Sequence, residues 1–418
     1  MSRWRLAAAA FVLYAIGQGV AVQSHALWYV LLAQDGGWSR ATLAVGTTLF
    51  HLAAAGTGVL VGLWIDDHQG RTPLASGTFW LVLGCLWLGI APWLWVVYGG
   101  FVLLGIGFAC LGPVVVGKVL ASHVPVHDRT AAMTLATSGT QVGLLLAPVT
   151  TWLALHEGRT VFGLVLAGLT LLVLLPLLPV LTRTQTHSPA PSLEGKGTET
   201  LTLTHARRQP AYWRLAGSVF LVVLAQAGYA AHSVLIYGAV TDLATGARLL
   251  ALSAACGVGT RLWLYLKPPA WTPPKLAAMV YAVESLGLGL LASGWMLPGA
   301  VLFGGAATLT LMLEPLLAAH LCGTQTYGTL YGPIYAGSRL AAALGALVYG
   351  LSVTVWGSYT PVLGLMAVSL AVASVLIRAL TPLASPTEGL RDRGRSPGAK
   401  LPGRPGHSRQ SAPRSPGR

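Results

Sequence analysis

The sequence predicts an all-α integral membrane protein with twelve transmembrane helices in two pseudo-symmetric six-helix bundles. The first observation is composition: the 418 residues are 54% hydrophobic and only 9% charged. A soluble protein carries roughly a quarter charged residues, whereas a surface in contact with lipid needs none. The second observation is that apolar segments of about 20 residues, enough to cross a bilayer, recur along the chain. The third is one polar stretch that divides these segments into two equal sets.

The predicted spans follow the apolar segments in order. Those of the first half lie at residues 7–32, 42–64, 75–93, 97–120, 128–154 and 160–181, and those of the second half lie at 213–239, 248–267, 276–295, 299–320, 328–353 and 361–380. We therefore expect an N-terminal half at 1–182, a cytoplasmic linker at 183–212, a C-terminal half at 213–380 and a disordered basic cytoplasmic tail at 381–418. The linker and the tail are rich in Pro, Gly and polar residues, and such segments cannot bury enough apolar surface to fold.

The basic residues predict the orientation of the chain. Eight of the 26 Lys and Arg lie in the tail after Pro386, and most of the others fall in segments on the same side of the membrane as the N-terminus. Only Arg40, Arg159 and Arg248 fall in segments on the opposite side. Cytoplasmic loops are enriched in Lys and Arg, so we expect both termini in the cytoplasm and the protein in the inner or plasma membrane. The net charge of +14 therefore indicates topology and contact with the lipid bilayer, not nucleic-acid binding.

Several function classes are excluded by missing patterns. The four cysteines stand singly in apolar segments, so neither a disulfide framework nor a zinc site is expected. The eleven histidines form no HExxH pattern, and the sequence contains no Walker motif. We therefore expect neither an enzyme nor an ATP-driven pump, and neither a cofactor nor a metal. A monomer is expected.

The loop between the second and third spans carries a polar motif, Gly62-Leu-Trp-Ile-Asp66-Asp67-His68-Gln69-Gly70-Arg71. It resembles the signature G-x-x-x-D-R-x-G-R of the major facilitator superfamily, with Asp67 at the position of the Arg and the first Gly displaced by one. The resemblance implies a latch that breaks when helices slide. We therefore expect Gly62, Asp66, Asp67 and Arg71 to control opening toward the cytoplasm; the alternative is an ordinary turn.

Further motifs are similar to one branch of that superfamily, the monocarboxylate transporters and oxalate–formate antiporters. They are the GWSRA sequence at 37–41, the start of the fifth span at 128–132, the start of the sixth at 158–162, His232 with 259–261 in the seventh and eighth spans, and the segments at 327–345 and 357–359. The similarity extends from about residue 10 to residue 380. It implies the twelve-helix major facilitator fold and secondary active transport.

Polar side chains recur at helical spacing on four predicted spans. They are Tyr14, Gln18, His25 and Tyr29 on the first span, Thr130, Thr134, Thr137 and Gln141 on the fifth, Gln226, Tyr229, Ser233 and Tyr237 on the seventh, and Tyr331, Tyr335, Ser338 and Arg339 on the eleventh. Such residues also hold membrane helices together by hydrogen bonds, which is the alternative. The resemblance implies that these four spans line a central cavity between the halves.

Two arginines lie inside predicted spans, Arg261 and Arg339. A charged residue at the centre of a membrane helix costs about 2.5–3.5 kcal/mol on insertion scales, so it needs a partner or a wet cavity. The resemblance implies that both arginines bind a substrate carboxylate, which the planar guanidinium pairs bidentately. The alternative is a structural ion pair between Arg261 and Glu314.

Coupling to protons needs a titratable group. The resemblance places an Asp one turn before the Arg of the eighth span, but this chain has Gly257 there. Glu314, Glu284, His25 and His232 are the residues that remain for this role, and each has a structural role as the alternative.

The predicted function is secondary active transport of small organic anions, either mono- or dicarboxylates, by alternating access. Both proton coupling and antiport are compatible with the sequence. One alternative is an exporter of amphipathic or aromatic compounds, because tyrosines recur on the predicted cavity faces. An alternative from another class is a membrane sensor that binds a ligand without transporting it.

Overall fold

The computed structural model describes residues 3–68, 71–145, 147–183, 202–238, 243–269 and 271–383. Within these ranges the regular structure is helical. The N-terminal half contains α1 (Arg3–Gln18), the π-helix η1 (Gly19–Gln23), α2 (His25–Gly36), α3 (Arg40–His68), α4 (Arg71–Ile90), α5 (Leu94–Cys110), α6 (Pro113–His123), the 3-10 turn η2 (Val126–Asp128), α7 (Arg129–Leu145) and α8 (Ala147–Arg183). The C-terminal half contains α9 (Leu203–Arg207), α10 (Pro210–Gly238), α11 (Leu243–Leu266), α12 (Pro273–Ala292), α13 (Met296–Ala307), α14 (Thr310–Cys322), α15 (Tyr327–Trp356) and α16 (Thr360–Arg378).

The helices confirm the predicted fold class. In the described part of the chain, ten helices are long and apolar enough to cross a membrane, or up to eleven if the bent pair α13 and α14 forms one span. The predicted fifth span corresponds to α7 and the start of α8, where threonines lower the hydropathy. At Gly158 the backbone of α8 leaves the helical region with φ 75° and ψ 176°, a conformation that suits glycine, and the sixth span begins there. This arrangement is consistent with twelve helices.

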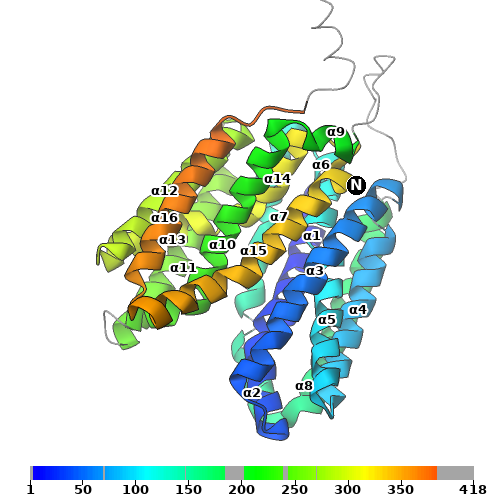
Figure 1. Ribbon diagram of the computed structural model, residues 1–418. Coiled ribbons are helices and arrows are strands. Elements are labelled where there is room, and N and C mark those ends of the chain that lie inside the picture. Colours follow the sequence, from blue (N-terminus) through cyan, green and yellow to red (C-terminus); the bar gives the residue numbers. More distant parts are fainter. Residues whose placement is uncertain are drawn as a thin grey trace, which may run out of the picture.

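The two halves lie side by side and meet mainly through a few helix pairs. These pairs are α3 with α15, α7 with α11 and α14, and α6 with α14 and α15. Figure 1 shows the halves close together at the end that carries the N-terminus and α9, and apart at the opposite end, where α2 and α8 lie on one side and α11 and α16 on the other. The interface between the halves is therefore tightest at the end with the N-terminus, called here the terminal end.

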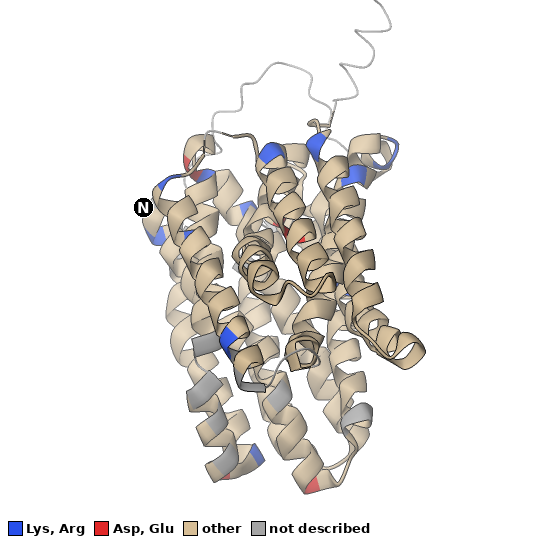
Figure 2. Ribbon diagram, turned by 90° about the vertical axis from the view of Figure 1, so that its left-hand side faces the viewer, with Lys and Arg blue, Asp and Glu red and all other residues tan. Residues whose placement is uncertain are grey.

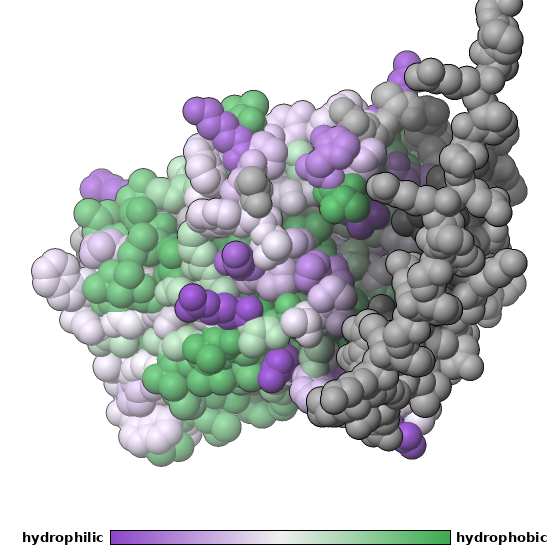
Figure 3. All heavy atoms as spheres, turned by 90° about the horizontal axis from the view of Figure 1, so that it is seen from above, coloured by the Kyte–Doolittle hydropathy of each residue, from purple (hydrophilic) through white to green (hydrophobic). Residues whose placement is uncertain are grey.

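The surface has the distribution expected of a protein in a bilayer. Large apolar side chains such as Leu60, Trp95, Leu172 and Val375 are exposed on the outside of the bundle. Lys and Arg gather at the terminal end (Figure 2), and hydrophilic side chains lie among hydrophobic ones when that end is viewed from above (Figure 3). The chain is a multi-pass membrane protein, and the cytoplasmic location of the terminal end stays a prediction.

The helices differ from the sequence expectations at two places, in the first span and in the linker. The first span was expected to be one regular helix, but η1 interrupts it between α1 and α2. The linker predicted at 183–212 is helical from Leu203, in α9 and the start of α10. Residues 184–201 and the tail from 384 onward lie outside the described residues.

Candidate functional site

Arg261 of α11 reaches across the interface between the two halves. Its Nη1 donates to the carbonyl oxygen of Thr137 at 2.7 Å and to Thr140 Oγ1 at 3.3 Å, both on α7. Its Nε donates to the carbonyl oxygen of Thr308 at 2.9 Å, and its Nη2 donates to the same oxygen. The side chain is buried, with 5% exposure. All of these acceptors are neutral, so the guanidinium charge is solvated by the backbone rather than by a counterion.

The predicted alternative for Arg261, an ion pair with Glu314, is not formed. Neither Arg261 nor Arg339 has a carboxylate oxygen within 4.0 Å in the described ranges. Glu314 is buried on α14, and its Oε1 has no hydrogen-bond partner. Arg339 is the cation that interacts with Glu314 electrostatically. The physical reason is that Thr308 and the threonines of α7 already occupy the donors of Arg261.

Arg339 lies near the middle of α15, about 15 Å along the helix from Thr329 at a rise of about 1.5 Å per residue. Its Cζ is 5.0 Å from the centroid of the Tyr335 ring, a cation–π contact, and its Nε is 3.4 Å from Ser338 Oγ. Across the interface, His51 of α3 interacts with it electrostatically. Arg339 therefore stands between the two halves, as Arg261 does.

A layer of buried polar groups lies between Arg339 and the terminal end. Tyr331 and Tyr335 are fully buried on α15, with ring centroids 6.3 Å apart, and Tyr14 on α1 interacts electrostatically with Tyr335 and with Glu314. Within the described ranges, no well-formed hydrogen bond reaches the hydroxyl groups of the three tyrosines or Oε1 of Glu314, and the Tyr331 hydroxyl lies close to the Glu314 carboxyl group. Buried polar groups usually have hydrogen-bond partners, so this layer is suited to a polar ligand.

The remaining polar residues of the first span lie around η1. His25 of α2 packs edge-on against Phe50 and Phe101, with ring centroids 4.6 and 5.2 Å away, and its Nε2 has no partner. Tyr29 shares a hydrogen bond with Thr47 of α3. Gln18 is half-buried at the end of α1, where it packs beside Gly143 of α7, and Gln141 of α7 is half-buried as well.

Glu284 of α12 is fully buried inside the C-terminal half, at 0% exposure. Its Oε2 accepts from Gln226 Nε2 at 2.8 Å, and its Oε1 accepts from Thr310 Oγ1 at 3.0 Å. Gln226 Nε2 also lies 2.8 Å from Thr310 Oγ1. The predicted cavity residue Gln226 therefore faces α12 and α14 of its own half.

Two other residues of the predicted stripe on α10, Tyr229 and Tyr237, make contacts within their half, and so does the neighbouring His232. Tyr229 shares a hydrogen bond of 2.7 Å with the hydroxyl of Tyr237, and its ring lies 4.4 Å from that of Phe303. His232 has Nδ1 3.0 Å from the Tyr359 hydroxyl and Nε2 3.0 Å from the carbonyl oxygen of Ala346. His232 thus joins α10 to α15 and to the start of α16, and both of its ring nitrogens have partners.

Asp66 connects the two halves at the terminal end. Its carboxylate accepts from the backbone nitrogens of Gly328 at 3.1 Å and Thr329 at 2.7 Å, in the first turn of α15. Unpaired N–H groups and the helix dipole make this turn a favourable place for a negative charge. The sequence motif predicts that Asp66 acts within its own loop. In the structure, Asp66 instead contacts α15 across the interface between the halves. The side chains of Asp67 and Arg71 lie outside the described part of the chain.

Lys118 of α6 completes this contact. Its Nζ is 2.7 Å from Asp66 Oδ1, and it also donates to the carbonyl oxygens of Thr324 and Gln325 just before α15. Gly62 lies against Gly328 and Gly332 at the crossing of α3 and α15, where a Cβ on Gly62 would overlap the Gly328 carbonyl oxygen. We call Asp66, Lys118 and the first turn of α15 the terminal latch. The sequence analysis does not predict this role of Lys118. A positive charge inside an apolar segment is the feature that could have indicated it.

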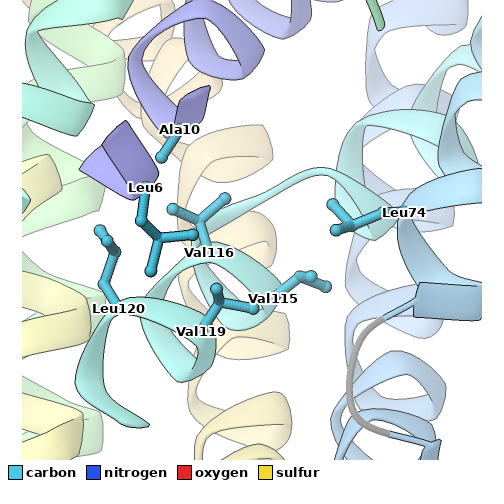
Figure 4. A pocket seen from close by; sticks show the side chains of 7 residues that line it. All are labelled: Leu6, Ala10, Leu74, Val115, Val116, Val119 and Leu120. Atoms are coloured by element: carbon cyan, nitrogen blue, oxygen red, sulfur yellow. The ribbon is translucent and has the colours of Figure 1, made fainter. Parts of the chain in front are cut away.

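A pocket separate from these polar groups lies between α1, α4 and α6 (Figure 4). Its lining is entirely apolar: Leu6, Ala10, Leu74, Val115, Val116, Val119 and Leu120. It contains none of the residues predicted to bind an anion. In the described part of the chain, no group of three or more His, Cys, Asp or Glu side chains is arranged to hold a metal ion.

The comparisons agree with this architecture. A family model described as Major Facilitator Superfamily matches residues 6–346. A curated Arabidopsis thaliana protein, "Ascorbate transporter, chloroplastic", is 28% identical over 117 residues, which is 27% of this chain. The match spans only 21% of the length of that relative.

Solved structures with low sequence identity share the fold. The fucose:proton symporter FucP of E. coli matches with a TM-score of 0.71 at 14% identity, over 91% of this chain and 98% of that chain. FucP in the outward conformation matches with a TM-score of 0.71 at 15% identity, over 92% and 99%. The human organic anion transporter TETRAN matches with a TM-score of 0.69 at 14% identity, over 90% and 100%.

Proposed function

We propose that this chain, which belongs to the major facilitator superfamily, carries small organic anions across a membrane by alternating access. The family and the fold are those of transporters and not of enzymes. In alternating access, two halves rock about a site near the middle of the membrane, and the site faces one side at a time.

The observation that carries the anion assignment is the environment of Arg261. A buried cation normally has a counterion, because an unpaired charge is costly to keep out of water. Among the described residues, the hydrogen-bond acceptors of Arg261 are carbonyl and hydroxyl oxygens, on both halves of the protein. A carboxylate that replaces some of these oxygens would receive two parallel hydrogen bonds from the guanidinium, which is the strongest pairing available to it.

Arg339 supplies a second positive charge at the interface between the halves. A monocarboxylate engages one arginine, whereas a dicarboxylate of suitable length engages both. Tyr14, Tyr331, Tyr335 and His25 have unpartnered polar atoms. These atoms bind the remaining polar groups of the substrate as the interface opens. Two similar proteins, an ascorbate transporter and an organic anion transporter, support the assignment, whereas FucP is a fucose symporter.

The terminal latch closes one side of the transport path in this proposal. Asp66 stabilises the first turn of α15 only while α3 and α15 stay together, so the latch favours the conformation closed at the terminal end. A contact that differs between two conformations shifts their populations. Changes in the latch therefore alter turnover more than the affinity of the site for its substrate.

The test is uptake of labelled carboxylates into proteoliposomes, with lactate and succinate as probes, with and without a pH gradient. We expect uptake of at least one probe by the parent protein and a severe loss in Arg261→Lys, because a compact ammonium cannot reproduce the planar fork. Arg248→Lys is the matched control, since Arg248 is an exposed arginine on the same helix, α11. Unchanged uptake by Arg261→Lys would remove Arg261 from the site, and no uptake of any carboxylate by folded protein would refute the anion assignment.

A further inference from the structure

The break between α13 and α14 lies between two buried sites, those of Arg261 and Glu284. The two helices meet at an angle of 41°, on either side of Thr308 and Leu309. A broken helix leaves carbonyl groups that need partners from elsewhere. The carbonyl oxygen of Thr308 accepts from Arg261, and that of Ala307 lies 3.4 Å from Gln226 Nε2. The anion site and the Glu284 site therefore use neighbouring peptide groups of one break.

Glu284 is held on the other side of the break by neutral donors. Thr310 is the first residue of α14 and donates to Oε1, and Gln226 donates to Oε2. No Lys, Arg or His nitrogen lies within 4.0 Å of Glu284 in the described ranges. Of the titratable groups around it, Tyr281 on the same helix interacts electrostatically with both Glu284 and Glu314 of α14. Glu284 is thus a buried carboxyl group whose ionised form depends on two hydrogen bonds.

The chemistry of such a group makes it a proton site. An ionised carboxylate without a cation is costly to bury, and the group takes up a proton when its donors are withdrawn. Thr310 is only two residues from Thr308, so a movement at the break that shifts one residue shifts the other. The acceptor of Arg261 and the donor to Glu284 therefore lie on the same break.

We propose that Glu284 binds a proton together with the transported anion, and that the break at Thr308–Thr310 links the two events. This inference rests on the proposed binding of an anion by Arg261. An anion draws the guanidinium away from Thr308, the break relaxes, Thr310 turns from Glu284, and the carboxylate takes a proton from solvent. Linkage is reciprocal, so protonation of Glu284 also strengthens anion binding, and proton and anion favour each other.

The experiment is calorimetric titration of purified protein with lactate and with succinate, in buffers with different ionisation enthalpies. The parent protein should take up about one proton per anion, and its affinity should therefore rise by about tenfold for each unit that the pH falls between about 8 and about 6. Glu284→Gln, which imitates the neutral acid, should bind without proton uptake and with an affinity that no longer depends on pH. Glu157→Gln, an exposed control, should behave as the parent.

Thr310 is a positioning residue in this scheme and gives a second test. Thr310→Val removes the hydroxyl and should weaken the dependence of affinity on pH while binding through Arg261 persists. Thr310→Ser should restore the dependence, and Thr354→Val on the exposed face of α15 should leave it unchanged. Full proton uptake in Glu284→Gln, with binding still dependent on Arg261, would overturn the inference and leave the anion assignment standing. Failure of the folded parent to bind either anion would overturn both.

Discussion

At the scale of single residues, the partners of a buried charge decide its role. Arg261 bonds to neutral oxygens, whereas Glu314 interacts with Arg339, so the two arginines should respond differently to loss of Glu314. We expect the melting-temperature shifts of Arg261→Ala and Glu314→Ala to add in the double variant, because residues that share no contact are close to independent. The shifts of Arg339→Ala and Glu314→Ala should not add, because each removes a charge that the other senses.

Thermal unfolding of the three single and two double variants in one detergent provides this comparison. Recovery of the melting temperature when Glu314→Ala is added to Arg261→Ala would show that a structural pair exists and would contradict the bonding described for Arg261. Arg339 thus serves as the control for Arg261, because both arginines lie on helices at the same interface.

The residues that the sequence could and could not predict differ in a physical way. Arg261 and Arg339 are predicted because a charge inside an apolar span is conspicuous, and Asp66 is predicted from the motif between the second and third spans. The roles of Thr308 and Lys118 depend on backbone carbonyl groups of segments far away in the chain. No local pattern encodes such a partner, and Lys118 was therefore counted only as one of the basic residues that predict orientation.

At the scale of helices, the crossing of α3 and α15 depends on the absence of side chains. Gly62→Ala would place a methyl group against the carbonyl of Gly328, and such overpacking costs about 1–3 kcal/mol. We expect this to favour the conformation open at the terminal end by roughly tenfold, since about 1.4 kcal/mol changes an equilibrium tenfold. Gly56→Ala is the matched control, because its Cβ would meet nothing within 4 Å on the same helix.

Accessibility of the latch reports this shift. With the four native cysteines replaced, Thr329→Cys supplies one thiol in the first turn of α15, and its rate of reaction with a maleimide measures how often the terminal end opens. The Gly62→Ala variant should react faster than the parent, and Gly56→Ala should match the parent. Equal rates of maleimide reaction in all three proteins would show that the crossing of α3 and α15 does not control the opening of the terminal end.

Helix positions were largely predictable, whereas the irregularities within helices were not. A run of about 20 apolar residues is sufficient to place a span, and α10, α12 and α16 lie close to their predicted ranges. The π-helix at Gly19–Gln23 adds a wider turn that changes the phase between Tyr14 and His25, so the single stripe predicted on the first span is divided. η1 packs against α7 and α8, and the apolar pattern of the segment carries no sign of the irregularity.

At the scale of the whole molecule, the two halves should move as units about their interface. A covalent link across the terminal latch should therefore stop transport, whereas a link inside one half should not. Asp66→Cys with Thr329→Cys provides the first link, because Asp66 Oδ2 lies 2.7 Å from the backbone nitrogen of Thr329. Ser285→Cys with Ala367→Cys provides the second, because Ser285 Oγ lies 2.7 Å from the carbonyl oxygen of Ala367 in the C-terminal half.

Both pairs are made in a background without native cysteines, joined with a short reducible cross-linker, and tested for uptake in proteoliposomes before and after reduction. Alternating access requires the halves to separate at the terminal end once in every cycle, so the first link should abolish uptake and reduction should restore it. Uptake that continues with the first link in place would mean that the solute crosses without separation of α3 from α15. Loss of uptake with the second link would instead place the essential movement between α12 and α16, inside a half that rigid-body rocking treats as one unit.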